Sequence, residues 1–206
     1  MTLPAPLPPP NPPAARATRR PRADASERIL RATAHAIVAT GAVTLTMHDV
    51  AEEAGVSKGL IHYHFHDKET LLARLVEWMT RNLVARERSA LTESVPRHAI
   101  DDLWAWLDGE LRRGHLRVLS ELAEWRGPLV RREVIESARA RRATATDTVE
   151  QLFAFLGLKP RIPAGLMADV VVAFVDGLAV STVVVPEGNP RAAYDVFWLS
   201  LLSLAE

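Results

Sequence analysis

The chain has 206 residues, 48% of them hydrophobic, which is enough apolar material to bury a core in one domain or in a small domain joined to a larger one. Lysine plus arginine and aspartate plus glutamate number 25 each, so any binding of nucleic acid must depend on local clusters of charge. Cysteine is absent, which excludes disulfides, thiol nucleophiles and thiolate metal sites and suits a reducing compartment.

Residues 1–23 are expected to form a disordered arm that is rich in proline and then basic, since they hold eight of the fourteen prolines. The segment lacks the continuous apolar stretch of a secretory signal, so we expect a soluble, cytoplasmic protein. Its arginines, at 16, 19, 20 and 22, are available for phosphate contacts, although incidental charge on a tail is the simpler interpretation.

Capping residues divide the next part of the chain into four predicted helices. The first runs over 24–41, from an Asp-Glu capping pair to a glycine. Thr46 caps the second helix, which stops at Gly55, and Ser57 immediately caps the third. Asp67 caps a long fourth helix with an apolar stripe.

The rest of the chain is also predicted to be helical, and no stretch shows a convincing alternation of apolar and polar residues that would indicate a strand. Apolar residues over 100–111 form one helical stripe, and three glycines interrupt the pattern beyond it, at Gly114, Gly127 and Gly157. Pro163 and Pro190 open two final helices that are apolar around much of their circumference. The segment 165–185 is membrane-like in composition but carries two aspartates, so a buried or dimer-forming helix explains it better.

The second and third helices have the features of a helix-turn-helix. Small Ala51 and Gly55 allow close approach of the two helices, and Ile61 and Phe65 fix the second of them to the core. Polar side chains cover its outer face and the start of the next helix: Lys58, His62, Tyr63, His64 and Lys68.

Across this region, from Ile29 to Leu72, the sequence resembles the tetracycline repressor (TetR) family. The resemblance is carried by Thr46-Met47-His48-Asp49-Val50-Ala51, Gly55-Val56-Ser57-Lys58-Gly59, Tyr63-His64-Phe65, Asp67-Lys68-Glu69 and Leu71. It implies an all-α protein with a three-helix DNA-binding head at 24–70 and a larger helical body at 71–206, which binds an effector and dimerises.

The resemblance also implies roles for single residues. Thr46 and Ser57 would contact phosphates as helix caps, and Lys58 and Gly59 would lie at the entering end of the recognition helix. Three further side chains would clamp the DNA backbone: Tyr63, His64 and Lys68. His62 departs from the family, which commonly has tyrosine there, but an imidazole can still donate a hydrogen bond.

In the body, the resemblance implies two further sites, an effector pocket among the middle helices and a dimer interface. Trp104 and Trp125, with His115 as a polar anchor, are candidates for an effector pocket, although core packing is the simpler role for each tryptophan. Two consecutive apolar helices at the C-terminus could be internal core, but they also suit a two-fold four-helix interface, which the resemblance favours. The predicted interface residues are Val171, Leu178, Phe197 and Leu201.

The sequence therefore predicts a ligand-responsive repressor that binds a palindromic operator in double-stranded DNA as a homodimer. No cofactor is expected, and no metal, since histidines two apart on a helix diverge. A helical enzyme is the main rival from another class, but no nucleophile-base set supports it. A ligand-independent DNA-binding protein and a transcriptional activator remain as alternatives.

Overall fold

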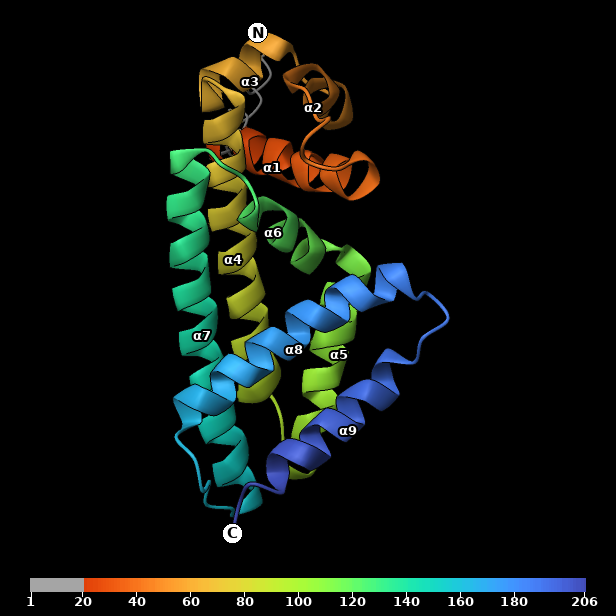
Figure 1. Cartoon of the computed structure of the whole chain (residues 1–206). Helices are drawn as coiled ribbons and strands as arrows, with labels where there is room; N and C mark the ends of the chain where they lie inside the picture. The colour runs from red at the N-terminus through yellow and green to blue at the C-terminus, as the bar shows by residue number, and fades with distance from the viewer. Residues whose placement is uncertain (1–20) are drawn as a thin grey trace, which may run out of the picture.

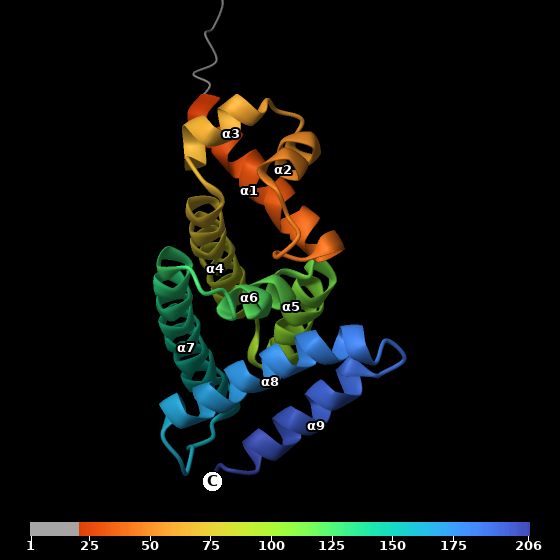
Figure 2. The same cartoon turned by 45° about the horizontal axis from the view of Figure 1, so that its top comes forward.

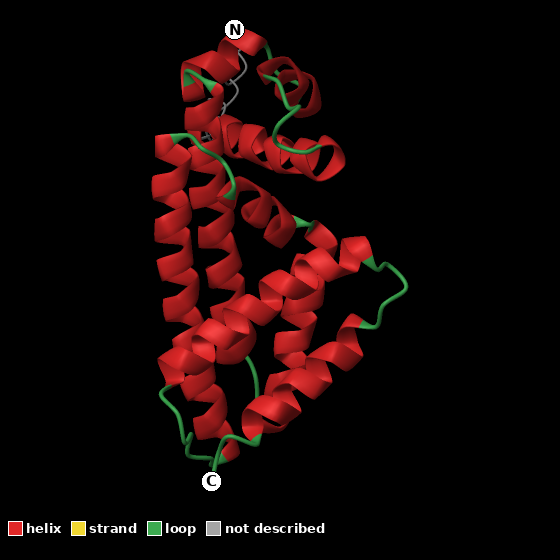
Figure 3. Cartoon of the chain, viewed as in Figure 1, coloured by secondary structure: helices red, strands yellow, loops and turns green. Residues whose placement is uncertain are grey.

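The computed structural model describes the backbone of residues 21–206 and the side chains of residues 25–206. Almost all of the predicted arm therefore lies outside the described residues. Within them the chain is helical, with no extended strand (Figures 1 and 3). The helices are α1 (Pro21–Thr40), α2 (Met47–Ala54), α3 (Lys58–Phe65), α4 (Lys68–Thr92), the 3₁₀ turn η1 (Pro96–His98), α5 (Ala99–Arg113), α6 (His115–Ala123), α7 (Pro128–Leu156), α8 (Ala164–Val184) and α9 (Pro190–Leu202).

The predicted caps fix the boundaries of α2, α3 and α4. Thr46, Ser57 and Asp67 each have extended backbone angles and accept a hydrogen bond from an amide three residues on. Gly55 ends α2 in the left-handed region, at φ 62°. The start of α1 was predicted three residues too late, because Pro21 occupies the first turn, where its missing N–H costs no helical hydrogen bond.

The head, α1 to α3, sits at one end of the molecule on top of α4 and α6 (Figure 1). Its core is formed by buried apolar side chains from all three helices and from α4, including Ile29, Ile37, Val50, Ile61, Phe65 and Leu71. α4 continues from the head into the body and packs along α7, the most extensive helix pair in the described structure. The predicted boundary between residues 70 and 71 thus falls inside α4, so head and body share one helix.

The helices α8 and α9 form an antiparallel pair on the part of the body away from the head (Figures 1 and 2). By length and composition α8 passes as a membrane span, with a mean hydropathy of 1.9, yet its two aspartates are paired with α7. Arg142 Nε donates to Asp169 at 2.5 Å, and both terminal nitrogens of Arg141 donate to Asp176. These pairs, with the buried apolar face of α8, attach the helix to the bundle.

Candidate nucleic-acid interface

Thr46 caps α2 through a reciprocal pair of hydrogen bonds. The Asp49 amide donates to Thr46 Oγ1 at 3.2 Å, and the Thr46 amide donates to the Asp49 carboxylate at 2.8 Å. The hydrogen bond from the Thr46 backbone is the main reason that the pKa of Asp49 lies below its usual range. Because the Thr46 hydroxyl accepts in this arrangement, its own proton stays available for an external acceptor such as a phosphate oxygen.

At the start of α3, Ser57 and Gly59 leave an open, polar surface. Ser57 Oγ accepts from the Leu60 amide at 3.2 Å and is exposed. A Cβ atom added to Gly59 would meet nothing nearer than 3.9 Å, and Gly59 has no positive φ. The fold therefore does not require glycine here, and the missing side chain leaves space for close approach of an external molecule.

The two faces of α3 differ sharply in burial. Ile61 and Phe65 are buried in the head, whereas Lys58, His62 and Tyr63 are exposed. His64 is half-buried, with its ring edge-on to Tyr63 at 5.3 Å between centroids. The structure thus brings the predicted residues of α3 onto the head surface around one short helix.

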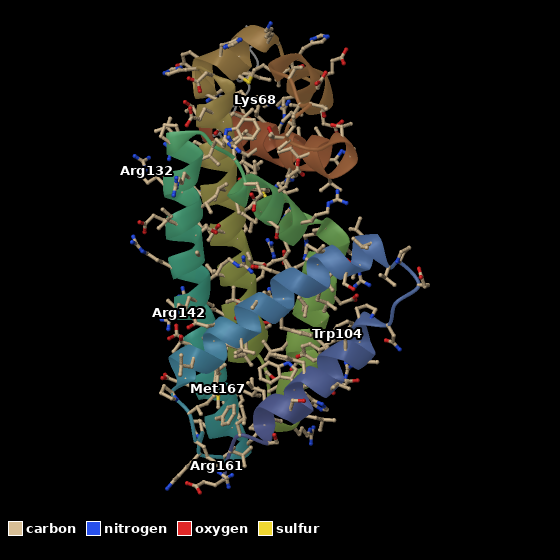
Figure 4. The ribbon with its side chains drawn as sticks, in the orientation of Figure 1. Lys68, Trp104, Arg132, Arg142, Arg161 and Met167 are labelled. Carbon is tan, nitrogen blue, oxygen red and sulfur yellow. The ribbon has the colours of Figure 1, made fainter. Side chains whose placement is uncertain are left out.

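Lys68 is engaged by the protein rather than projecting freely from α4. Its Nζ donates to the Val43 carbonyl at 3.1 Å and lies 5.1 Å from the centroid of the Trp125 ring (Figure 4). Partial burial lowers the pKa of Lys68, while the nearby Asp49 carboxylate opposes that shift. In this conformation Lys68 links the loop between α1 and α2 to the loop between α6 and α7.

His66, which sequence reasoning considered only as part of a metal set with His62 and His64, ends α3 with an unusual backbone. It has φ 56° and is the only residue other than glycine with positive φ in the described chain. His62 Nδ1 lies 2.8 Å from the His66 carbonyl oxygen, and His66 Nδ1 lies 3.1 Å from the His62 carbonyl oxygen. Both imidazoles are exposed. The repeated histidines at 62, 64 and 66 were the available signal for this pair.

The three residues predicted for an effector pocket lie in three separate places. Trp125 packs near Lys68, and Trp104 lies 5.1 Å from the Tyr194 ring, between α5 and α9 (Figure 4). His115 contacts Trp78 at 5.9 Å between ring centroids, and burial lowers its pKa, which favours the neutral imidazole. The residues are therefore not one constellation, and packing accounts for both tryptophans.

A cavity of about 20 Å³ lies instead at the centre of the body. It is lined by residues of α4 to α8, namely Leu83, Glu87, Trp106, Leu116, Arg141, Ala145, Val171, Val172 and Val175. Trp106 also forms a wall of a wider hollow of about 480 Å³ on the surface between α4 and α5. The indole N–H of Trp106 is buried and has no hydrogen-bond partner among the described residues. Sequence reasoning missed Trp106, Glu87 and Arg141, although Glu87 interrupts the apolar spacing of α4.

The predicted dimer residues lie mainly on the inner face of α8 and α9. Val171, Leu178 and Leu201 are buried in the core of the subunit itself, and Phe197 is half-buried, stacked on Phe174. Their burial within one subunit leaves little of these side chains for a partner to cover. A stripe of exposed apolar residues runs along the opposite face of the two helices, comprising Leu166, Val170, Val180, Val184, Val196 and Leu199.

Comparison with known proteins identifies the family. Residues 29–75 match the model for bacterial regulatory proteins of the tetR family. The chain is 30% identical over 159 residues to the HTH-type transcriptional regulator BetI of Stenotrophomonas maltophilia (strain R551-3), covering 74% of this chain and 78% of that protein. The chain belongs to the TetR family. It is a DNA-binding transcriptional regulator.

Solved structures of similar fold cover the TetR-family body as well as the head. A transcriptional regulator from Rhodococcus sp. Rha1 has a TM-score of 0.71 at 22% identity, covering 87% of this chain and 97% of that one. FadR from Bacillus subtilis, in complex with stearoyl-CoA, has a TM-score of 0.70 at 16% identity, covering 86% of this chain and 97% of that one. The all-α fold with its N-terminal helix-turn-helix is thereby confirmed.

In this TetR-family chain, α6 holds the head directly. The Arg117 side chain donates to the Val38 carbonyl at the end of α1, and the Glu121 carboxylate accepts from the Ala42 amide. Leu116, next to Arg117, lines the central cavity. One short helix therefore touches both the cavity and the DNA-binding head.

Proposed function

We propose that this TetR-family regulator is a ligand-responsive repressor that binds a palindromic operator as a homodimer in the cytoplasm. The observation that carries the proposal is the position of α6, on which Leu116 lines the cavity and Arg117 bonds the head. A molecule that enlarges the cavity must displace its lining, and displacement of α6 acts on α1.

The proposed DNA contacts are the predicted residues of the head: Thr46, Ser57, Lys58, Gly59, His62, Tyr63, His64 and Lys68. Exposure of the first three and the open space at Gly59 support their part in this set. For Lys68 to bind phosphate, its ammonium must leave the Val43 carbonyl, so its contact requires a rearrangement on DNA binding. Residues 24–70 form the proposed DNA-binding domain, and residues 71–206 the proposed effector and dimerisation domain.

The proposed effector site is the central cavity beside Trp106. A volume of about 20 Å³ holds little more than one water, so an effector would bind only a conformation in which the lining residues have separated. Such a ligand prefers the expanded state and shifts the population toward it. FadR of Bacillus subtilis, which shares the fold, is described in complex with stearoyl-CoA, which supports a ligand-binding body here.

The proposed dimer face is the exposed apolar stripe on α8 and α9. Its valines and leucines are large side chains left in contact with water, and a two-fold partner would bury them as a four-helix interface. Gly177 lies on the exposed side of α8 with nothing within 4 Å of its Cβ position, which leaves room for a close helix crossing. The dimer is what would place two heads on one operator.

Selection of bound fragments from a genomic DNA library with the purified protein tests the proposed function. The expected result is a palindromic site with half-sites about one helical turn apart or a multiple of it. A site without two-fold symmetry would contradict the dimer. A reporter gene placed behind the selected site should be expressed less when the regulator is present, whereas increased expression would favour an activator.

A further inference from the structure

The helix-turn-helix of this regulator carries a charge balance that opposes binding to a polyanion. Residues 46–67 contain one lysine, Lys58, against four carboxylates, together with four histidines at 48, 62, 64 and 66. With neutral histidines the segment is therefore negative by three charges, and with all four protonated it is positive by one. Because the affinity of proteins for DNA rests largely on cations that neutralise phosphates, the charge state of the histidines decides the sign of this segment's net charge.

The geometry of His62 and His66 fixes where each neutral imidazole carries its proton. Each Nδ1 faces the carbonyl oxygen of the other residue, at 2.8 Å and 3.1 Å. A carbonyl oxygen only accepts, so each Nδ1 must be the protonated nitrogen and must donate. The second ring nitrogen, Nε2, then bears a lone pair in the neutral form.

A phosphate oxygen also only accepts, so it gains no hydrogen bond from a neutral Nε2. Protonation converts Nε2 into a donor and adds a positive charge, while the Nδ1 hydrogen bond to the backbone stays in place. We propose that His62 and His66 bind DNA phosphates through Nε2 only in the protonated form, so that DNA binding by this regulator takes up protons. The proposal rests on the DNA-binding face proposed above and makes His66 a further member of it.

The charged groups on neighbouring elements are largely engaged with other partners. On α2, His48 pairs with Glu52, Glu53 pairs with His35, and Asp49 accepts from the Thr46 amide. On α4, Lys68 donates to the Val43 carbonyl and Glu69 accepts from the Leu129 amide. Asp67, between α3 and α4, is the exception that acts on the pair. Its pKa is lowered chiefly by the hydrogen bond from the Thr70 amide and further by His66.

The test measures binding of the full-length protein to a fluorescently labelled, mixed-sequence DNA duplex at low salt. Between about pH 6 and about pH 8 the association constant should fall at least about tenfold, because each proton that binding takes up lowers the constant by up to tenfold per pH unit. Calorimetry in buffers of different ionisation enthalpy should show net proton uptake near neutral pH. A constant that does not change over this range would overturn the proposal.

Variants assign the effect to the pair. His62→Gln combined with His66→Asn, the latter chosen because asparagine tolerates positive φ, should lose at least half of the pH slope of DNA binding. His62→Lys carries a permanent charge and should raise affinity at about pH 8. His35→Gln, on α1 and paired with Glu53, is the matched control and should keep the full slope.

The outcomes separate this proposal from the DNA-binding face on which it rests. If the unaltered protein binds no duplex at any pH, the face itself is wrong. If it binds and the double variant keeps the whole pH slope, the face stands and the histidine proposal fails. NMR of the imidazole nitrogens tests the protonation state of the two histidines in the unaltered protein, without any substitution. The free protein should show Nδ1–H tautomers at about pH 8, and added DNA should protonate Nε2.

Discussion

Glu87 is a carboxyl group held inside the body, where it lines the cavity on the inner face of α4. Its side chain is 6% exposed, and the Thr148 hydroxyl donates to it at 2.8 Å. Burial raises the pKa of Glu87 to about 7, although the Thr148 hydrogen bond and the charge of Arg141 oppose the shift. The folded protein therefore binds this proton more tightly than the unfolded chain does.

The raised pKa makes the stability of the protein depend on pH. The contribution of Glu87 to the free energy of unfolding is full below about pH 4.5 and is lost as the pH rises through about 7. Replacing Glu87 with glutamine, which keeps an acceptor for Thr148, should remove this dependence and stabilise the protein at about pH 8 by up to about 3 kcal/mol. Urea unfolding at several pH values measures both effects.

Glu77→Gln is the matched control for that experiment. The side chain of Glu77, on the same helix, is 41% exposed and pairs with Arg74, so its substitution should leave the pH dependence of unfolding unchanged. If the free energy of unfolding changes with pH in the same way in the unaltered protein and in Glu87→Gln, then Glu87 is ionised in the folded protein at no cost in stability.

Single residues were predicted from the sequence where their chemistry is local. The caps at Thr46, Ser57 and Asp67 act on amides three residues away, so composition and spacing were sufficient to find them. The engagement of Lys68 with Val43 and Trp125 depends on parts of the chain 25 residues away or more, which no local pattern encodes.

Among the elements of the body, the short helix α6 contacts the head through both its start and its side chains. Besides the bonds from Arg117 and Glu121, a Cβ atom on Gly114 would lie 2.9 Å from Val38, so the start of α6 fits closely against α1. Glu121 satisfies the amide of Ala42, a residue that is 1% exposed. A buried amide without such a partner is costly.

Removing the Glu121 carboxylate should therefore weaken the packing of α6 against the head. For Glu121→Ala we expect a loss of about 1–3 kcal/mol in the free energy of unfolding and faster hydrogen exchange at the Ala42 amide. Glu121→Gln preserves an acceptor oxygen and should lie close to the unaltered protein in both measurements. Unchanged exchange at Ala42 in the alanine variant would show that water replaces the carboxylate there.

Helix α8 shows why the functional faces were harder to predict than the helices themselves. It is apolar around most of its circumference, so hydrophobic periodicity identified the helix but did not distinguish its inner from its outer face. Val171 and Leu178 turned out to pack inward, and Val170 and Val180 outward. The central cavity was likewise beyond sequence reasoning, because its lining comes from five helices.

For the whole molecule, the exposed stripe on α8 and α9 makes the oligomeric state testable. Leu199 is 71% exposed in the subunit, so a charge at this position does not disturb the core of the monomer. In the proposed dimer it would be buried without a partner. We expect Leu199→Glu to yield folded monomers by light scattering. Operator binding should be at least about tenfold weaker, since each head would then bind its half-site without a linked second head.

Val43→Glu provides the control for that substitution. Val43 is 78% exposed and lies in the head, away from the stripe, so the variant should remain dimeric. A dimer that persists in Leu199→Glu would place the interface elsewhere on the body.

The unbroken run of α4 from the head into the body has a mechanical consequence. Its 25 residues span about 37 Å, so a tilt of about 5° around the Thr92 end displaces the Lys68 end by roughly 3 Å. That displacement is close to the rise of one base pair, about 3.4 Å, and a two-fold partner moving oppositely would double it. In the proposed dimer, a helix of this length would convert a tilt of a few degrees around the cavity into a mismatch between the spacing of the two heads and that of the DNA grooves.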